Sequence, residues 1–419
     1  MKKSLFFLGV GVLAMLSVAG CKNTKNPYDD TTKLYPAGVS TTVKSESDMK
    51  FGYIGKKGSM DIAAQFTYAA TFSCGYANVE TGSLDTYIDK KGNIQSVPVS
   101  SDGYCTTFWN DYARVSDNGK YGFLDKKLNY AVPAIYASLG RMSKEKLAWE
   151  RLSSNDDKYG FINGDGEQKI AEQFSEAYVF TDGVAAVKMG DRWGAIDKKG
   201  NWKIQPVYYD LFPLGEDLYG YLEDSKDEYY GVINTSGKVI APKQFQDLGS
   251  FGDNSLCPVK RDGKWGYMNT KGDIKINCIY SYAMPFSDGY AFVYLDNDDE
   301  TCVMIDKKGG TKLQLSKDED IYSDGQPVWF PHNGLFLVAN EQEDRITYSY
   351  RDTDGNTVYS WTWTYESSSW DYDYYYAPRR AKVQKFNEKR MEGGINFGLG
   401  KKQLQSTTDR KSTRLNSSH

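Results

Sequence analysis

The chain has 419 residues, a formal net charge of −4, 40% hydrophobic residues and 33 tyrosines. This aromatic content excludes a disordered chain, and the acidic balance argues against nucleic acid as a partner, because phosphate binding requires a basic face. Only two histidines occur, His332 and His419, which excludes Ser-His-Asp and Cys-His catalysis and multi-histidine zinc sites.

The chain begins with a processing signal. Two lysines precede an apolar stretch that ends in the motif VAGC at Cys21. This motif resembles a bacterial lipobox, which predicts a signal peptide over 1–20 and a lipid on Cys21 that holds the protein on a membrane surface. The alternatives are an ordinary secretory signal and one transmembrane helix, for which the stretch is short. Residues 21–47 are polar after Cys21, so we expect a flexible tether.

An aromatic residue followed by glycine recurs through residues 48–315. Successive glycines from Gly122 to Gly266 are 34 to 38 residues apart, and degenerate copies start at Asp85 and Cys302. A period in this range indicates a tandem array of one supersecondary unit. The clear pairs are Phe51 with Gly52, Tyr121 with Gly122, Tyr159 with Gly160, Trp193 with Gly194, Tyr230 with Gly231, and Trp265 with Gly266.

Each copy predicts three short strands and a tight turn. In the copy at Trp193, the strand "WGAID" runs into the turn "DKKG", a second strand "NWKIQP" follows, and a third comes after a loop. At the turn, Asp caps its own backbone and Gly takes the left-handed conformation. In the copy at Tyr121, Leu128 replaces this glycine, and we expect Asn129 to take positive φ.

A glycine after the aromatic residue allows a neighbouring backbone or ring to approach closely. One three-stranded unit cannot bury its apolar face alone, so adjacent copies are expected to stack. The repetition therefore predicts a core built from successive copies.

The combined pattern resembles the bacterial WG-repeat family. The resemblance rests on "WGAIDKKG" from Trp193, on the following strand with its proline, and on "FTDGVAAV" and "FSDGYAFV" from Phe180 and Phe286. It implies a β-rich array, often on exported or surface proteins, without common catalytic residues. We therefore expect an all-β fold: a tandem array of roughly eight three-stranded WG-type repeats, either a curved solenoid or propeller-like.

An aromatic-rich β region is expected over 316–408, where "NTVYSWTWTY" alternates as a strand does. Its aromatic rings either form a platform for glycan rings or cap the open edge of the last repeat, since large aromatics are core residues first. The possible ligand-binding aromatics are Trp361, Trp363, Trp370 and Tyr374.

Two further stretches of sequence are not expected to form sites. The segments "DNDDE" and "DTDGN" lack the full spacing of a calcium loop and are predicted to be turns. Residues 409–419 resemble a translated sequencing adapter, so we exclude them from the fold and expect the natural C-terminus to be missing.

These patterns favour a protein without catalysis, cofactor or metal. The first hypothesis is a lipoprotein of the bacterial cell envelope, at the outer membrane or cell surface, whose repeat array binds a protein partner. The second is a carbohydrate-binding lipoprotein that uses tyrosine and tryptophan platforms. In both, the lipid on Cys21 provides the contact with the membrane.

Overall fold

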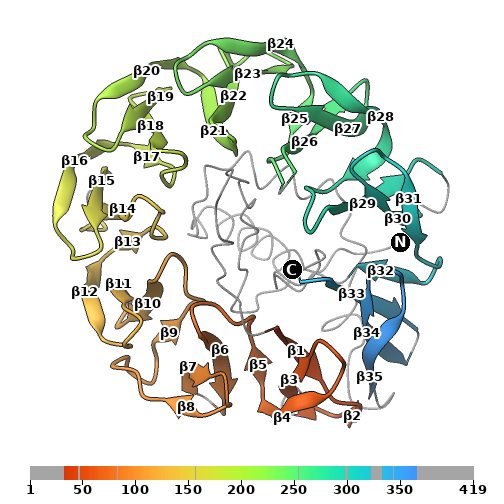
Figure 1. Ribbon diagram of the computed structural model, residues 1–419. Helices are drawn as coiled ribbons and strands as arrows, with labels where there is room; N and C mark the ends of the chain where they lie inside the picture. Colours follow the sequence, from red (N-terminus) through yellow and green to blue (C-terminus); the bar gives the residue numbers. More distant parts are fainter. Residues whose placement is uncertain are drawn as a thin grey trace, which may run out of the picture.

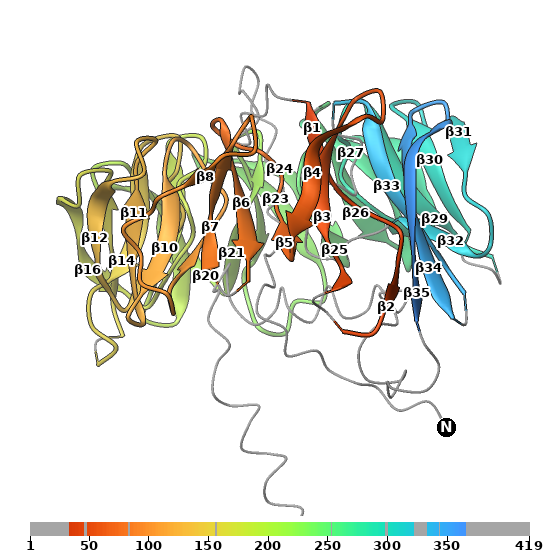
Figure 2. The same ribbon diagram turned by 90° about the horizontal axis from the view of Figure 1, so that it is seen from below.

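The computed structural model describes residues 33–45, 48–82, 84–155, 157–252, 254–297, 301–321, 333–342 and 344–365. In these ranges the chain folds into small, mostly antiparallel sheets that follow one another around a ring (Figure 1). Seen from the side, the strands run between the two ends of this ring (Figure 2). The structure confirms the all-β prediction, and of the two expected shapes it has the propeller-like one. No helix in these ranges is long and apolar enough to cross a membrane.

The first six sheets follow the chain order. Sheet 1 contains β1 (Leu34–Gly38), β3 (Phe51–Gly55) and β4 (Met60–Phe66). Sheet 2 contains β5 (Tyr68–Ala69), β6 (Tyr76–Thr81), β7 (Leu84–Asp89) and β8 (Ile94–Gln95). Sheet 3 contains β9 (Tyr104–Cys105), β10 (Ala113–Asp117), β11 (Lys120–Leu124) and β12 (Tyr130–Tyr136). Sheet 4 contains β13 (Ser138–Leu139), β14 (Leu147–Arg151), β15 (Tyr159–Asn163) and β16 (Gln168–Phe174). Sheet 5 contains β17 (Glu176–Ala177), β18 (Val184–Met189), β19 (Arg192–Asp197) and β20 (Trp202–Tyr208). Sheet 6 contains β21 (Asp210–Gly215), β22 (Leu218–Leu222), β23 (Tyr230–Asn234) and β24 (Val239–Phe245).

The remaining sheets complete the ring. A continuous strand, β28 (Ile274–Ala283), joins sheets 7 and 8, because its first part pairs with β27 and its last part with β29. Sheet 7 contains β25 (Asp247–Leu248), β26 (Leu256–Arg261), β27 (Lys264–Asn269) and the start of β28. Sheet 8 contains the end of β28, β29 (Tyr290–Leu295), β30 (Cys302–Asp306) and β31 (Thr311–Gln314). Sheet 9 contains β32 (Glu319–Ile321), β33 (Leu335–Glu341), β34 (Arg345–Asp352), β35 (Thr357–Tyr365) and β2 (Thr41–Val43).

The sequence repeat and the sheet are out of phase. The copy that starts at Tyr159 supplies β15 and β16 to sheet 4, and its third long strand, β18, pairs with β19 of the next copy, Val187 opposite Gly194. A short inner strand, absent from the three-stranded prediction, makes most sheets four-stranded. Each copy therefore completes the sheet of its successor, which links neighbouring sheets through the chain itself.

The glycine after the aromatic residue lies under the backbone of the outer strand. A Cβ atom built on Gly194 would lie 2.6 Å from the carbonyl oxygen of Ile204, and one on Gly266 would lie 2.5 Å from that of Ile276. The pairing register shifts at this glycine because the outer strand bulges across it. The structure thus confirms the expected close approach.

The hairpin turns follow the predicted chemistry. The Asp197 carboxylate accepts hydrogen bonds from the backbone N–H of Lys199 at 2.8 Å and of Asn201 at 3.0 Å, and Gly200 has a φ of 83°. Asp352 caps the "DTDGN" segment in the same way, which confirms a turn there. The prediction for Asn129 is wrong: Leu128 itself takes the positive φ, 63°, because the turn fixes the fourth position whatever residue fills it.

Tyrosine hydroxyls tie neighbouring sheets together. Tyr53, one residue after Gly52, donates to the carbonyl of Ala70, which directly follows β5 of sheet 2, at 2.8 Å. Tyr267, at the equivalent position, donates to the carbonyl of Met284 at 2.7 Å. Both tyrosine side chains are fully buried. Each hydroxyl therefore supplies a hydrogen bond to a backbone carbonyl inside the core, between two sheets.

The ring closes where the start of the described chain meets its end. β1 lies in sheet 1, but the chain then crosses to sheet 9, where β2 pairs in parallel with β35, Thr41 opposite Trp363. The Tyr350 hydroxyl donates to the carbonyl of Pro36 at 2.8 Å, and the Trp363 indole N–H to that of Val39 at 3.1 Å. Residues 33–45 are therefore structured, unlike the expected tether.

Two of the possible ligand-binding aromatics belong to this closure. Trp361 and Trp363 are only 3% and 4% exposed and pack against Tyr348. They are core residues of sheet 9, so they do not form a glycan platform, and residues 333–365 belong to the ring. Trp370 and Tyr374 lie outside the described residues, as do Cys21 and the segments 1–32 and 366–419.

Candidate functional site

The two ends of the ring are built differently. At one, the turn end, hairpins join the third and fourth strands of the sheets with the Asx-turn geometry seen at Asp197. The turn end also carries the connections between the first and second strands, from 216–217 in sheet 6 to 140–146 in sheet 4. At the other, the loop end, two residues join the second and third strands in sheets 2, 3, 5 and 7, but 223–229 do so in sheet 6 and 152–158 in sheet 4. Long connections carried by single sheets of a constant scaffold are where binding residues are expected.

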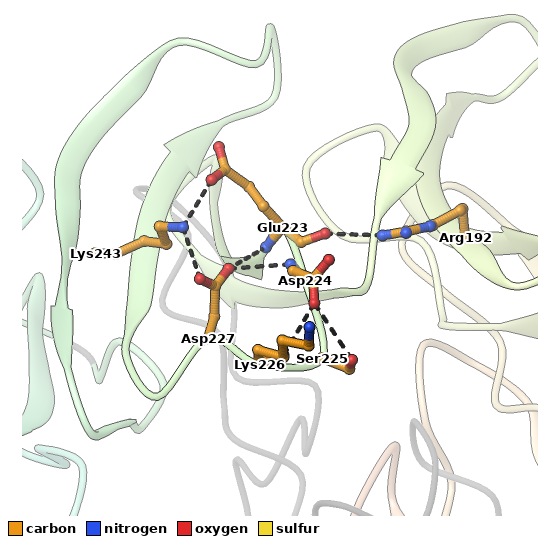
Figure 3. A network of polar contacts seen from close by, with 7 residues as sticks. All are labelled: Arg192, Glu223, Asp224, Ser225, Lys226, Asp227 and Lys243. Atoms are coloured by element: carbon orange, nitrogen blue, oxygen red, sulfur yellow. Dashed lines mark hydrogen bonds and ion pairs between the residues drawn. The ribbon is translucent and has the colours of Figure 1, made fainter.

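The loop over 223–229 is held in one shape by its own polar groups (Figure 3). The Asp227 carboxylate accepts hydrogen bonds from the backbone N–H of Glu223 and of Asp224, both at 3.0 Å. The Nζ of Lys243, from β24, lies 2.7 Å from the Glu223 carboxylate and 2.9 Å from that of Asp227. Arg192 of sheet 5 donates to the Glu223 carbonyl at 2.8 Å, which fixes the loop to the neighbouring sheet.

The charges in this loop are compensated. Hydrogen bonds from Lys243 and from the backbone lower the pKa of Asp227. The hydrogen bonds that Lys243 donates to Asp227 and Glu223 raise the pKa of Lys243. At neutral pH one ammonium group is thus shared by two carboxylates.

Four tyrosines lie at the same end of the ring as this polar network. Tyr208 and Tyr221 pack edge to face, with ring centroids 5.3 Å apart, and burial followed by the nearby Glu223 raises the pKa of both. Tyr209 and Tyr229 are 47% and 42% exposed. The site therefore has an aromatic base and two exposed rings.

The exposed tyrosines directly precede β21 and β23, the two strands that flank β22. Within sheet 6, Asp210 pairs with Leu222, and Tyr221 with Gly231. The backbone N–H of Tyr209 donates to the carbonyl of the same Leu222 at 2.9 Å, so Tyr209 lies at the loop end beside the residue that precedes Glu223. Tyr229 ends the loop over 223–229 and directly precedes β23.

Other repeats carry different residues at these two positions. Before the aromatic-glycine pair, where sheet 6 has Tyr229, five copies carry a basic residue: Lys50, Lys120, Lys158, Arg192 and Lys264. At the position of Tyr209, the same backbone hydrogen bond to the second strand is made by Thr67, Ala137, Ser175 and Gln246. Because residues of different types occupy these two positions in the other sheets, the fold does not require tyrosine there. The tyrosine pair is therefore specific to sheet 6.

The repeat-signature residues do not converge on one site. They lie one pair to a sheet, in the strand that follows the loop end, and Tyr159, Trp193 and Trp265 are buried. Their role is packing between sheets. The tyrosines of sheet 6 were missed by sequence reasoning, although aligning Tyr229 with the basic residues of the other copies would have revealed them.

The described ranges contain no group of three or more His, Cys, Asp or Glu side chains arranged to hold a metal ion. The five cysteines in these ranges are free thiols.

Five stretches of the chain match the family described as "WG containing repeat": 51–84, 159–193, 193–226, 230–265 and 265–297. The chain carries WG-containing repeats. Four of the matched WG repeats supply strands to sheets 4 to 8. The stretch 193–226 includes Trp193, Tyr209 and Glu223. No curated protein matches the chain.

Three solved structures are distantly similar to this ring. A eukaryotic initiation factor has a TM-score of 0.46 at 10% identity, covering 65% of this chain and 79% of that one. A quinonprotein alcohol dehydrogenase-like protein of Bacteroides thetaiotaomicron has a TM-score of 0.31 at 11% identity, covering 68% and 80%. PorZ of Porphyromonas gingivalis, a surface component of the type-IX secretion system, has a TM-score of 0.27 at 10% identity, covering 76% and 49%.

Proposed function

We propose that this protein is a non-catalytic lipoprotein of the bacterial cell envelope, at the outer membrane or cell surface, whose ring binds a macromolecular partner through its loop end. The observation that carries the proposal lies at the loop end: sheets 2, 3, 5 and 7 have two-residue connections there, while sheets 4 and 6 carry the long connections 152–158 and 223–229. Recognition of a specific partner requires such a non-repeating surface on a constant scaffold.

Two classes of partner fit this surface. A protein partner is the first, because extended rims of repeat arrays suit protein recognition. Carbohydrate is the second, and the exposed pair Tyr209 and Tyr229 favours it. An aromatic ring packs against the apolar face of a sugar, while polar groups beside the ring bind the sugar hydroxyls.

The lipid anchor predicts that a clickable fatty-acid analogue labels the protein in growing bacteria. A Cys21→Ser variant should lose the label and leave the membrane fraction, because the acyl chains supply the membrane contact. Gel fluorescence of the two proteins measures this. A Cys21→Ser variant that still carries the label would refute the anchor.

The binding surface predicts position-dependent crosslinking. With a photo-reactive amino acid in place of Glu228, an exposed residue at the loop end, ultraviolet light should yield an adduct of defined higher mass in intact cells. The same replacement of Lys199, an exposed residue at the turn end, should yield none. Adducts of equal yield from both ends, or from neither, would contradict the proposal.

A further inference from the structure

We propose that the loop end of sheet 6 is a binding site for a neutral oligosaccharide, with Tyr209 and Tyr229 as stacking platforms and Glu223, Asp227 and Lys243 as hydrogen-bonding groups. The inference rests on the proposed function, in that it takes the loop end as the binding end. It differs from the aromatic platform expected at Trp361 and Trp363, which are buried at the ring closure.

The spacing of the two exposed rings suits more than one sugar unit. Tyr209 directly precedes the first strand of sheet 6 and Tyr229 directly precedes the third, with the second strand, which Glu223 follows, between them. Two strand spacings amount to roughly 10 Å, which is wider than one pyranose ring. The platforms would therefore contact separate rings of one chain, with the polar groups of Glu223 and its neighbours between them.

The charges favour a neutral ligand over a cationic one. Glu223 and Asp227 both bind Lys243, at 2.7 Å and 2.9 Å. A lysine- or arginine-rich protein segment would have to displace this internal ammonium group before it could pair with either carboxylate. A sugar hydroxyl needs no displacement, because a paired carboxylate still has unused lone pairs and the ammonium group has a third proton.

The site is rigid before any ligand binds. Asp227 caps the backbone of Glu223 and Asp224, and Asp224 in turn accepts from the backbone of Lys226 at 3.0 Å (Figure 3). Arg192 secures the same loop to sheet 5. A preformed loop loses little conformational freedom on binding, which weak sugar ligands require.

The experiment uses the full chain with Cys21→Ser and isothermal calorimetry against neutral hexasaccharides of glucose, mannose, galactose and N-acetylglucosamine. At least one should bind. Tyr209→Ala and Tyr229→Ala should each weaken that binding about tenfold, and the double variant about a hundredfold, as for central aromatic contacts. Raising the salt from about 0.05 M to about 0.5 M should change the affinity less than about twofold, because a neutral ligand is not screened.

The matched control is Ile279→Ala, an exposed side chain on the outer strand of sheet 7, which should bind as the parent does. Thermal unfolding of all variants should coincide, because both tyrosines are exposed. Binding unchanged in the double variant, or no hexasaccharide bound at millimolar concentration, would overturn the inference. An oligolysine peptide that binds through Tyr209 and Tyr229 would replace it with a cationic partner. The crosslinking result at Glu228 is independent of these outcomes, because Glu228 is not one of the proposed sugar contacts, so loss of the sugar site and loss of the binding surface are distinguishable.

Discussion

Replacing Trp363 by alanine should destabilise the folded protein by roughly 3–5 kcal/mol, the range for truncating a buried tryptophan. The side chain is 4% exposed, packs edge-on against Phe51 with ring centroids 5.5 Å apart, and donates its indole N–H to Val39. These contacts join the last sheet to the first. Equilibrium unfolding in urea, followed by tyrosine and tryptophan fluorescence, measures the change.

A milder substitution at the same position separates packing from hydrogen bonding. Trp363→Phe keeps most of the aromatic contact with Phe51 but leaves the Val39 carbonyl without its indole donor, so we expect a loss of about 1–2 kcal/mol. If Trp363→Ala cost less than about 1 kcal/mol, the closure would contribute little to stability.

Replacing Gly266 by alanine should cost about 3 kcal/mol. The added methyl carbon would lie 2.5 Å from the carbonyl oxygen of Ile276 and 2.7 Å from the backbone of Asn277, so the bulged outer strand would have to move. Forcing extra atoms into a packed interior typically costs 1–3 kcal/mol, and backbone neighbours give way least. The free energy of unfolding in urea is again the measurement.

The control is Gly263→Ala, only three residues away. Gly263 has a φ of +77° but no atom within 4 Å of its added Cβ, so this substitution should cost about 1 kcal/mol from backbone strain alone. Equal losses at the two positions would show that close approach is not the reason for the glycine after the aromatic residue.

Local features of the fold were predictable from the sequence. The residues of the Asp-Lys-Lys-Gly turn determine its geometry, as the hydrogen bonds of Asp197 show. The glycine of the Trp-Gly pair indicates that the backbone of the neighbouring strand lies close to it. These features depend on residues within a few positions of one another, so sequence patterns suffice.

The phase of the sheets and the closure depended on long-range pairing. Inner strands such as Glu176–Ala177 have two residues, too few for a periodic pattern. β1 is buried at all five positions and so lacks the alternation of a half-exposed strand. β1 pairs with β3 nearby in the chain, but the pairing of β2 with β35 joins segments about 320 residues apart and appears only when the ring is complete.

The candidate site was hidden for a different reason. In a chain with 33 tyrosines, Tyr209 and Tyr229 do not stand out by type. Their significance comes from exposure and from the contrast with equivalent positions such as Ser175 and Arg192. The alternating aromatics at Trp361 and Trp363 were more conspicuous, but the same alternation marks a strand whose rings face a core.

Amide hydrogen exchange tests the closed ring most directly. In the parent protein, β1 and β34–β35 should exchange slowly, and Trp363→Ala should speed exchange in both segments together, although they are far apart in the chain. The strands of sheets 5 and 6, on the opposite side of the ring (Figure 1), should keep their protection at low denaturant. Faster exchange in β34–β35 with β1 unchanged would contradict a ring closed by its N-terminal strands.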